Sequence, residues 1–132
     1  APTHCEKFIA LTKKKFYDGI SFHRVVPNFV IQGGDPAGNG SGGPGYTIKA
    51  EFSSRKHLLG TVAMARTPDP NSAGSQFYIC LAALPSLDGQ YTTFGQVFEG
   101  IEVVKAIAVG DKMTKVTVAD VPIAKIPEAA RN

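Results

Sequence analysis

Hydrophobic residues near the start of the chain recur at the spacing of one helical face. The spacing predicts a first helix that begins at a Thr3 N-cap, with Glu6 completing a capping box, and that ends at Gly19. Its predicted inward positions are Cys5, Phe8, Ile9, Thr12 and Phe16.

Short runs rich in β-branched and aromatic residues fill most of the remaining chain. Residues 22–32 predict two short strands broken at Pro27, because proline cannot donate a ladder hydrogen bond. Residues 76–81 alternate between two sets of side chains, as a strand with two different faces requires. The other predicted elements are strands at 58–65, 92–97 and 115–119, a helix at 101–108 that Gly110 closes, and a polar tail punctuated by Pro122 and Pro127.

Together these elements predict a mainly β fold. Many short strands with two separated helices are typical of a closed or nearly closed antiparallel barrel with helices at its ends. No linker or internal repeat divides the chain, so we expect one domain spanning residues 1–132. Residues 33–45 are rich in glycine but lack the Gly-Lys-Ser/Thr ending of a phosphate-binding loop. We therefore interpret this segment as a long rim loop.

Composition and charge narrow the class of protein. Hydrophobic residues make up 43% and charged residues 19%, as in ordinary globular domains. No apolar run approaches the roughly 20 residues of a membrane helix, and the first residues lack the layout of a signal peptide. The net charge of +3 comes without a broad basic stripe, so we expect no nucleic-acid partner. The few cysteines and histidines form no metal-binding cluster, which predicts free thiols, no metal and a cytoplasmic location.

The stretch from Phe22 to Asp35 carries the most informative polar groups. Arg24 and Gln32 stand in it among aliphatic and aromatic residues, where an unpartnered polar group is costly to bury. Gln76 repeats this design on a later strand. Two such strands side by side would form an apolar pocket with a few hydrogen-bond donors. Taken alone, the pattern also fits an ion-paired arginine on a strand face and two amides satisfied at a sheet edge.

Several separated motifs resemble the signature segments of one family. They are residues 22–35 (FHRVVPNFVIQGGD), Met64-Ala65, residues 74–77 (GSQF), and Leu87-Asp88-Gly89 followed by Phe94-Gly95. In these motifs and in their order the chain is similar, from about Pro2 to Ala119, to the cyclophilins, which are peptidyl-prolyl cis–trans isomerases. The resemblance implies an eight-stranded antiparallel β-barrel capped by two α-helices.

The resemblance also implies roles for individual residues. Arg24 matches the catalytic arginine, and Gln32 would work beside it, either by holding Arg24 or by binding the carbonyl that moves. Ala65 and Arg66 occupy the segment that pairs with the substrate backbone. The remaining implied substrate-binding residues are Phe29, Val30, Gln76, Tyr78, Leu87, Tyr91 and Phe94.

Some positions depart from the common family pattern. Val30 stands where methionine is frequent, and Tyr78 where phenylalanine is frequent. Arg66 replaces a frequent asparagine, and Tyr91 replaces a histidine at the pocket rim, which implies a changed rate or sequence preference. Ser86 stands where many members carry a tryptophan, so we expect weakened affinity for cyclosporin.

The resemblance begins at the first helix. Family members have two strands before that helix, and the sequence contains none. We therefore expect an N-terminally incomplete barrel, belonging to a chain that is truncated or completed by another polypeptide. Unless a second chain supplies the strands, we expect a monomer.

Two functional hypotheses follow from the sequence. The first is an isomerase that accelerates rotation about X–Pro bonds in proline-containing peptides and in unfolded or folded protein clients, and so assists protein folding. The alternative is a non-catalytic module that binds proline peptides within a larger assembly. Twisting an amide requires only that the twisted form be bound best, so we expect no metal, nucleotide or other cofactor.

Overall fold

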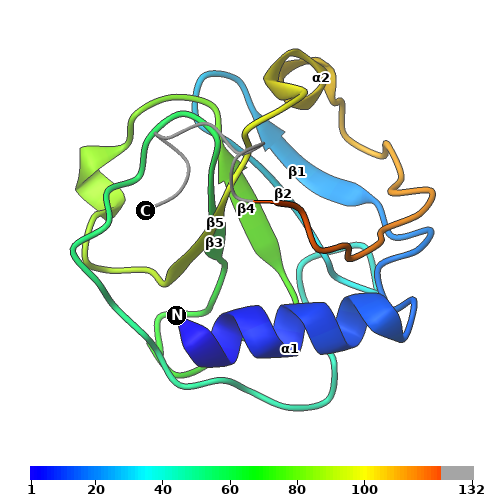
Figure 1. Cartoon of the computed structure of the whole chain (residues 1–132), viewed down its shortest axis with the longest axis horizontal. Helices are drawn as coiled ribbons and strands as arrows, with labels where there is room; N and C mark the ends of the chain where they lie inside the picture. The colour runs from blue at the N-terminus through cyan, green and yellow to red at the C-terminus, as the bar shows by residue number, and fades with distance from the viewer. Residues whose placement is uncertain (123–132) are drawn as a thin grey trace.

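One antiparallel sheet forms the centre of the molecule. The structure, a computed structural model, describes residues 1–122 of the chain. The sheet has five strands in the order β1-β2-β4-β3-β5 (Figure 1). The elements are α1 (Pro2–Lys13), β1 (Phe22–Val26), β2 (Val30–Gly33), β3 (Thr61–Met64), β4 (Phe77–Cys80), the 3-10 helix η1 (Pro85–Leu87), β5 (Thr93–Gln96) and α2 (Ile101–Ala106).

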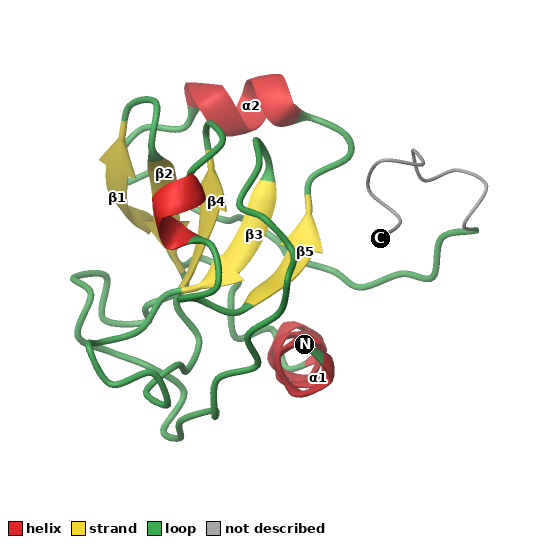
Figure 2. Ribbon diagram, turned by 90° about the vertical axis from the view of Figure 1, so that its left-hand side faces the viewer, coloured by secondary structure: helices red, strands yellow, loops and turns green. Residues whose placement is uncertain are grey.

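The two helices lie at opposite ends of the curved sheet (Figure 2). This arrangement confirms the predicted mainly β fold with two separated helices. The eight-stranded barrel is only partly present, because residues 1–122 contain five strands in one sheet. The break at Pro27 is also confirmed, since β1 ends at Val26 and β2 begins at Val30.

Side chains on the two faces of β4 belong to two separate apolar clusters. Phe77 enters the main core, which is covered by α1, and Ile79 packs against it. Tyr78 and Cys80 face the other way and join Val30 and Ala63 in a smaller cluster. The alternation predicted for residues 76–81 therefore separates a structural face from a second face that is free to carry a site.

The predicted capping box of α1 is wrong. Thr3 lies inside the helix, because Pro2 occupies the first turn, where its fixed φ and missing N–H are tolerated. The cap comes instead from Glu51, far along the chain. Its carboxylate accepts hydrogen bonds from the backbone N–H groups of Thr3 (3.1 Å) and His4 (2.7 Å). It also contacts Nδ1 of the buried His4 at 2.6 Å.

Both helices end earlier than predicted. α1 ends at Lys13 rather than near Gly19, because Lys15 turns left-handed (φ 61°) and Phe16 donates its N–H back to the Leu11 carbonyl. These bonds form a Schellman motif with lysine in the place that glycine usually takes. α2 ends at Ala106, before the predicted stop at Gly110.

The predicted strand at 115–119 is absent, although these residues are described. The chain instead pairs with the segment before β1, a few residues earlier than predicted. There the Met113 N–H donates to the Ile20 carbonyl at 2.9 Å, and Ser21 forms an antiparallel bridge with Lys112. Pairing stops because the N–H of Val116 donates to the Asp18 carboxylate instead of to a backbone carbonyl. Pro127, in the predicted tail, lies outside the described residues.

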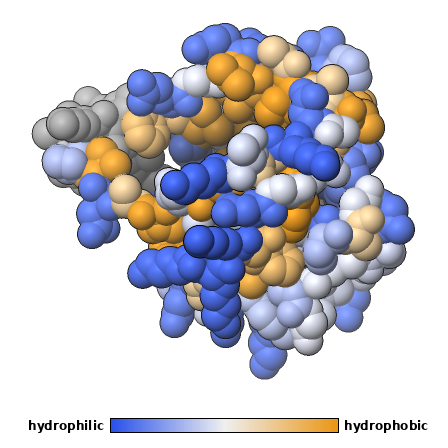
Figure 3. All heavy atoms as spheres, turned by 90° about the vertical axis from the view of Figure 1, so that its right-hand side faces the viewer, coloured by the Kyte–Doolittle hydropathy of each residue, from blue (hydrophilic) through white to orange (hydrophobic). Residues whose placement is uncertain are grey.

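The surface mixes polar and apolar side chains. Hydrophobic groups gather in the upper part of the face in Figure 3, the height at which α2 lies in Figure 1. Val103 of α2 is 62% exposed. Within residues 1–122 no helix has the length and hydrophobicity to cross a membrane. Cys5 and Cys80 are free thiols, as predicted, and Cys80 is fully buried.

The Glu51 cap leads to a stability prediction. Burial opposes ionisation of Glu51, but the hydrogen bonds from His4 and Thr3 outweigh it and lower its pKa below 4.5. We expect Glu51→Ala to cost about 1 kcal/mol at neutral pH, or about 4 °C in Tm. Because the folded pKa is the lower one, this stabilisation should disappear as pH falls through 4.5 and below.

Thermal unfolding of wild type and Glu51→Ala between neutral and acid pH measures the effect. Glu99→Ala, at an exposed carboxylate, is the matched control and should change Tm little. A difference between wild type and Glu51→Ala that stays constant down to acid pH would contradict the capping role.

Candidate functional site

Antiparallel register places the predicted site residues in one row across the sheet. Arg24 of β1 pairs with Gln32 of β2, and Gln32 pairs with Tyr78 of β4. Tyr78 in turn pairs with Ala63 of β3. Residues that are partners across neighbouring strands point to the same face of a sheet. The guanidinium, the amide and the phenol ring therefore share the face opposite the main core.

A pocket of about 370 Å³ opens on this face. We call it the Arg24 pocket. Its lining residues are His23, Arg24, Phe29, Val30, Gln32, Asn39, Gly40, Ala65, Arg66, Tyr78, Leu87 and Tyr91. The structure thus brings together all but two of the predicted site residues, Gln76 and Phe94.

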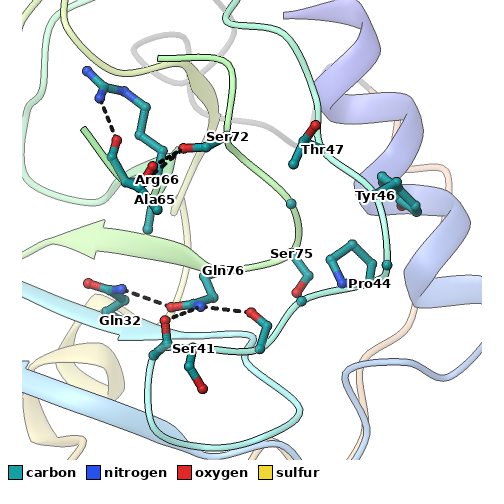
Figure 4. A pocket seen from close by; sticks show the side chains of 16 residues that line it. Gln32, Ser41, Pro44, Tyr46, Thr47, Ala65, Arg66, Ser72, Ser75 and Gln76 are labelled. Carbon is teal, nitrogen blue, oxygen red and sulfur yellow. Dashed lines mark hydrogen bonds between the residues drawn. The ribbon is translucent and has the colours of Figure 1, made fainter. Parts of the chain in front are cut away.

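Gln76 lies in an adjoining pocket of about 510 Å³, which the glycine-rich loop borders (Figure 4). We call it the glycine-loop pocket. The two pockets share Gln32, Gly40, Ala65 and Arg66, so together they form one continuous depression.

Phe94 does not belong to either pocket, contrary to its predicted role as a wall residue. Its ring packs against Phe8 of α1, with 5.2 Å between ring centroids. The reason is the register of β5, in which Thr93 is the partner of Ala63 and so takes the site face. Phe94 consequently points into the main core.

A polar relay connects Arg24 to the glycine-rich loop. Nη1 of Arg24 donates to Oε1 of Gln32 at 3.4 Å. Nε2 of Gln32 in turn donates to Oε1 of Gln76 at 3.2 Å, as Figure 4 shows. Nε2 of Gln76 then donates to the carbonyls of Gly40 (2.9 Å) and Gly42 (3.0 Å). Each amide can satisfy both neighbours in only one orientation, so the relay holds the guanidinium from one side.

Arg24 does not form an ion pair with any residue in 1–122; the described ion pairs are His4–Glu51 and His57–Asp88. Its guanidinium lies 5.9 Å from the ring centroid of Phe29. The side chain is exposed, and Gln32 is the one described residue that accepts a hydrogen bond from it. Most of the guanidinium fork therefore remains available to a ligand.

Asp35 shapes the glycine-rich loop from inside. Its carboxylate is 1% exposed and accepts the backbone N–H groups of Ala37 (2.8 Å), Asn39 (3.0 Å) and Gly40. Burial alone would raise the pKa of Asp35, but these hydrogen bonds outweigh it and lower the pKa. A side chain at Gly42 would collide with the same carboxylate, so glycine is required there.

The segment Ala65-Arg66 lies between the two pockets. The Ala65 N–H donates to the Gln76 carbonyl at 2.9 Å, whereas no residue in 1–122 pairs with the Ala65 carbonyl or the Arg66 N–H. The Arg66 side chain turns away over the ring of Tyr91, at 4.5 Å. It donates to the Gln90 carbonyl at 2.6 Å and to the Thr67 carbonyl at 2.9 Å. The backbone of this segment is thus open to an extended peptide.

Sequence reasoning missed two residues that support the pocket from behind. His57 bonds to the Tyr78 hydroxyl at 2.8 Å and to the Asp88 carboxylate at 3.0 Å. The sequence patterns assign no site role to either residue. No motif connects positions 57, 78 and 88, so only the fold reveals their proximity. His23 also borders the Arg24 pocket.

Comparison with known proteins places this chain in one family. The sequence model described as cyclophilin type peptidyl-prolyl cis-trans isomerase/CLD matches residues 1–128. A peptidyl-prolyl cis-trans isomerase of Synechococcus elongatus is 46% identical over 120 residues, which cover 89% of this chain and 82% of that protein. Peptidyl-prolyl cis-trans isomerase B of Bacillus subtilis is 45% identical over 120 residues, covering 89% and 83%.

Solved structures agree with the sequence relatives. A cyclophilin-type isomerase of Cryptosporidium parvum has a TM-score of 0.84 at 31% identity, with 92% of this chain and 86% of that chain covered. A crystal structure of that protein in the presence of the dipeptide Ala-Pro has a TM-score of 0.75 at 35% identity, covering 79% and 72%. The antiparallel fold is that of these cyclophilin-type structures. The chain belongs to the cyclophilin-type peptidyl-prolyl cis–trans isomerases.

The relay leads to a prediction for Gln76. Gln76→Leu removes the amide that joins Gln32 to the glycine-rich loop. We expect Kd for an Ala-Pro-containing peptide to rise about threefold to tenfold, the worth of one neutral hydrogen bond. Titration followed by NMR measures Kd.

Gln90→Leu is the matched control, because its amide donates to the Ser86 carbonyl outside the relay. It should leave Kd within about twofold of wild type. Equal effects of the two variants would show that the relay does not matter for binding.

Proposed function

We propose that this isomerase rotates X–Pro peptide bonds in the Arg24 pocket, with Arg24 as the hydrogen-bond donor. The observation that supports the proposal is the position of the guanidinium. It is held by Gln32 at the edge of an apolar pocket formed by Phe29, Val30 and Tyr78. A charged donor beside an apolar wall is suited to a proline ring whose amide nitrogen needs a partner.

The barrier to X–Pro rotation is amide resonance. It amounts to about 20 kcal/mol, so uncatalysed exchange takes tens of seconds or more. In the planar forms the nitrogen lone pair is delocalised into the carbonyl and accepts hydrogen bonds poorly. In the twisted form the nitrogen becomes pyramidal and basic. A donor aimed at this nitrogen therefore favours the transition state over both ground states.

Arg24 has the right chemistry for this donor. Its planar fork can bond Gln32 with one nitrogen while presenting others to substrate. Every 1.4 kcal/mol of stabilisation specific to the twisted bond raises the rate about tenfold. Gln32 acts in this proposal by orienting Arg24, because its amide oxygen is occupied by the guanidinium.

The substrate backbone would bind to Ala65-Arg66 in an extended conformation. The Ala65 carbonyl and the Arg66 N–H, which have no partner within residues 1–122, supply one acceptor and one donor for a strand-like pairing. The residues before the proline would then reach the glycine-loop pocket, which is continuous with the Arg24 pocket through Gln32 and Gly40. The proline ring would contact Phe29, Tyr78 and Leu87.

The clients we propose are proline-containing segments of unfolded and folded proteins. The crystal structure of the Cryptosporidium parvum relative in the presence of Ala-Pro supports the proposal that proline peptides are recognised. Because X–Pro isomerisation is slow enough to limit folding, we propose a role in protein folding. Two free cysteines favour a reducing compartment and so a cytoplasmic location.

Arg24→Ala tests the proposed catalysis. We expect kcat/KM for an Ala-Pro-containing peptide to fall roughly a hundredfold, as when a transition-state donor is removed. Arg24→Lys should restore little, because the donors of an ammonium all sit on one atom, whereas the planar guanidinium presents separate nitrogens to Gln32 and to the prolyl nitrogen. NMR exchange rates of the peptide give the measurement.

Arg55→Ala is the charge-matched control, since Arg55 is exposed and outside both pockets. Its rate should equal that of wild type. Unchanged isomerisation in Arg24→Ala would favour the alternative, a module that binds proline peptides without catalysis.

A further prediction concerns cyclosporin. Ser86 lies exposed in η1 beside the pocket residue Leu87, in the place where many family members have tryptophan. We expect wild type to bind cyclosporin weakly and Ser86→Trp to bind it at least about tenfold more tightly, because an indole adds apolar contact area. Calorimetric titration checks this. Equal affinities would contradict a role for position 86 in cyclosporin binding.

A further inference from the structure

The wall of the Arg24 pocket is supported by a buried histidine that the proposed mechanism does not use. His57 is 1% exposed. Its Nε2 lies 2.8 Å from the Tyr78 hydroxyl, and its Nδ1 lies 3.0 Å from Oδ1 of Asp88. Its backbone also takes part: the N–H donates to Asp88 at 2.6 Å, and the carbonyl accepts the N–H of Leu84 at 2.8 Å.

In the row Tyr78, His57, Asp88, each side chain donates a hydrogen bond to the next. The backbone N–H of His57 holds the pKa of Asp88 below its usual value, so the carboxylate is ionised and can only accept. We therefore assign the imidazole proton to Nδ1, which donates to Asp88. Nε2 is then an acceptor and receives the hydroxyl proton of Tyr78. The hydroxyl of the buried Tyr78 thus has a hydrogen-bond partner on the side away from the pocket.

Aromatic packing extends this group to the pocket rim. The Tyr91 ring stands edge-on to Tyr78, with 5.8 Å between centroids and an interplanar angle of 89°. It also packs against His57 at 6.5 Å. Arg66 covers the outer side of Tyr91 at 4.5 Å. Pocket residues from β4 and from the segment before β5 therefore meet at one imidazole.

A tyrosine in this position has a requirement that phenylalanine lacks. Its hydroxyl must find a partner, because an unsatisfied buried hydroxyl is costly. His57 provides that partner on the side away from the pocket. Without His57, the nearest alternative is water in the pocket, and the Tyr78 ring would have to turn toward it. The turned ring would occupy the space that the proline ring needs.

We propose that His57, held by Asp88, is a positioning residue that keeps the Tyr78 ring in the pocket wall and so sets the affinity for proline. The proposal rests on the proposed function of the Arg24 pocket as the proline site. His57 does not touch the substrate. It acts on binding through Tyr78, and it acts equally on the planar and the twisted bond.

The test is a set of variants that includes a rescue. We expect His57→Leu to raise KM about tenfold with kcat within about twofold of wild type, because uniform binding is lost. Adding Tyr78→Phe removes the hydroxyl that needs a partner, so the double variant should return to within about threefold of the wild-type KM. A merely structural histidine would not be rescued by a second deletion at the same site.

Tyr17→Phe provides the matched control. Tyr17 is also a buried tyrosine, and its hydroxyl donates to the Ser75 carbonyl at 3.0 Å in the main core. We expect Tyr17→Phe to lower Tm without changing KM, and to give no rescue of His57→Leu.

If His57→Leu does not fold, Asp88→Asn tests the same positioning role, because Asp88 holds the His57 ring. Loss of the carboxylate lets the imidazole proton move to Nε2, which then no longer accepts from Tyr78. We expect KM to rise about threefold in Asp88→Asn and to recover when Tyr78→Phe is added.

NMR spectra of the free proteins separate this proposal from the proposed function. Ring signals of Tyr91 and methyl signals of Leu87 should shift in His57→Leu and return in the double variant, whether or not the protein catalyses isomerisation. Peptide Kd should follow the same pattern as KM. If KM, Kd and these signals match wild type in His57→Leu, or if the changes persist in the double variant, the positioning role is wrong.

Discussion

The register of β2 between β1 and β4 is the constraint on which the site depends. It sets Arg24, Gln32 and Tyr78 side by side on one face and leaves Phe77 for the core on the other. Because side chains alternate along a strand, a slip of one residue would bury the guanidinium and expose the core. The buried apolar face thus holds the polar groups in place without any covalent link.

The interactions around this row fall into two layers. In front, the amides of Gln32 and Gln76 connect Arg24 to a loop that the buried Asp35 has already shaped. Behind, His57 and Asp88 hold the ring of Tyr78. The front layer positions a charge and the rear layer positions an apolar wall. The proposed function needs both, because it requires a proline ring and its nitrogen to be held at the same time.

Local patterns predicted much of the fold, and long-range contacts explain the failures. Alternation within residues 76–81 and the break at Pro27 are properties of the strand itself, so they could be inferred from sequence. The cap of α1 comes from Glu51, some fifty residues away along the chain, which no local pattern indicates. The strand predicted at 115–119 failed because the Asp18 side chain takes the N–H of Val116.

The site, like the fold, was predicted only in part. Motif residues such as Arg24 and Gln32 were identified, and the fold gathers them around one pocket. Phe94 was misplaced because the shifted register of β5 gives the site face to Thr93. Of three departures from the family pattern, Tyr91 contacts both of the others, Arg66 and Tyr78. Separate substitutions in the sequence are therefore one structural unit beside the pocket.

Exchange NMR on a proline peptide with a catalytic amount of the wild-type protein tests the central claim most directly. The account predicts cross-peaks between the cis and trans peptide signals at mixing times far below the tens of seconds of the uncatalysed reaction. Chemical-shift changes that show binding, without such cross-peaks, would contradict it.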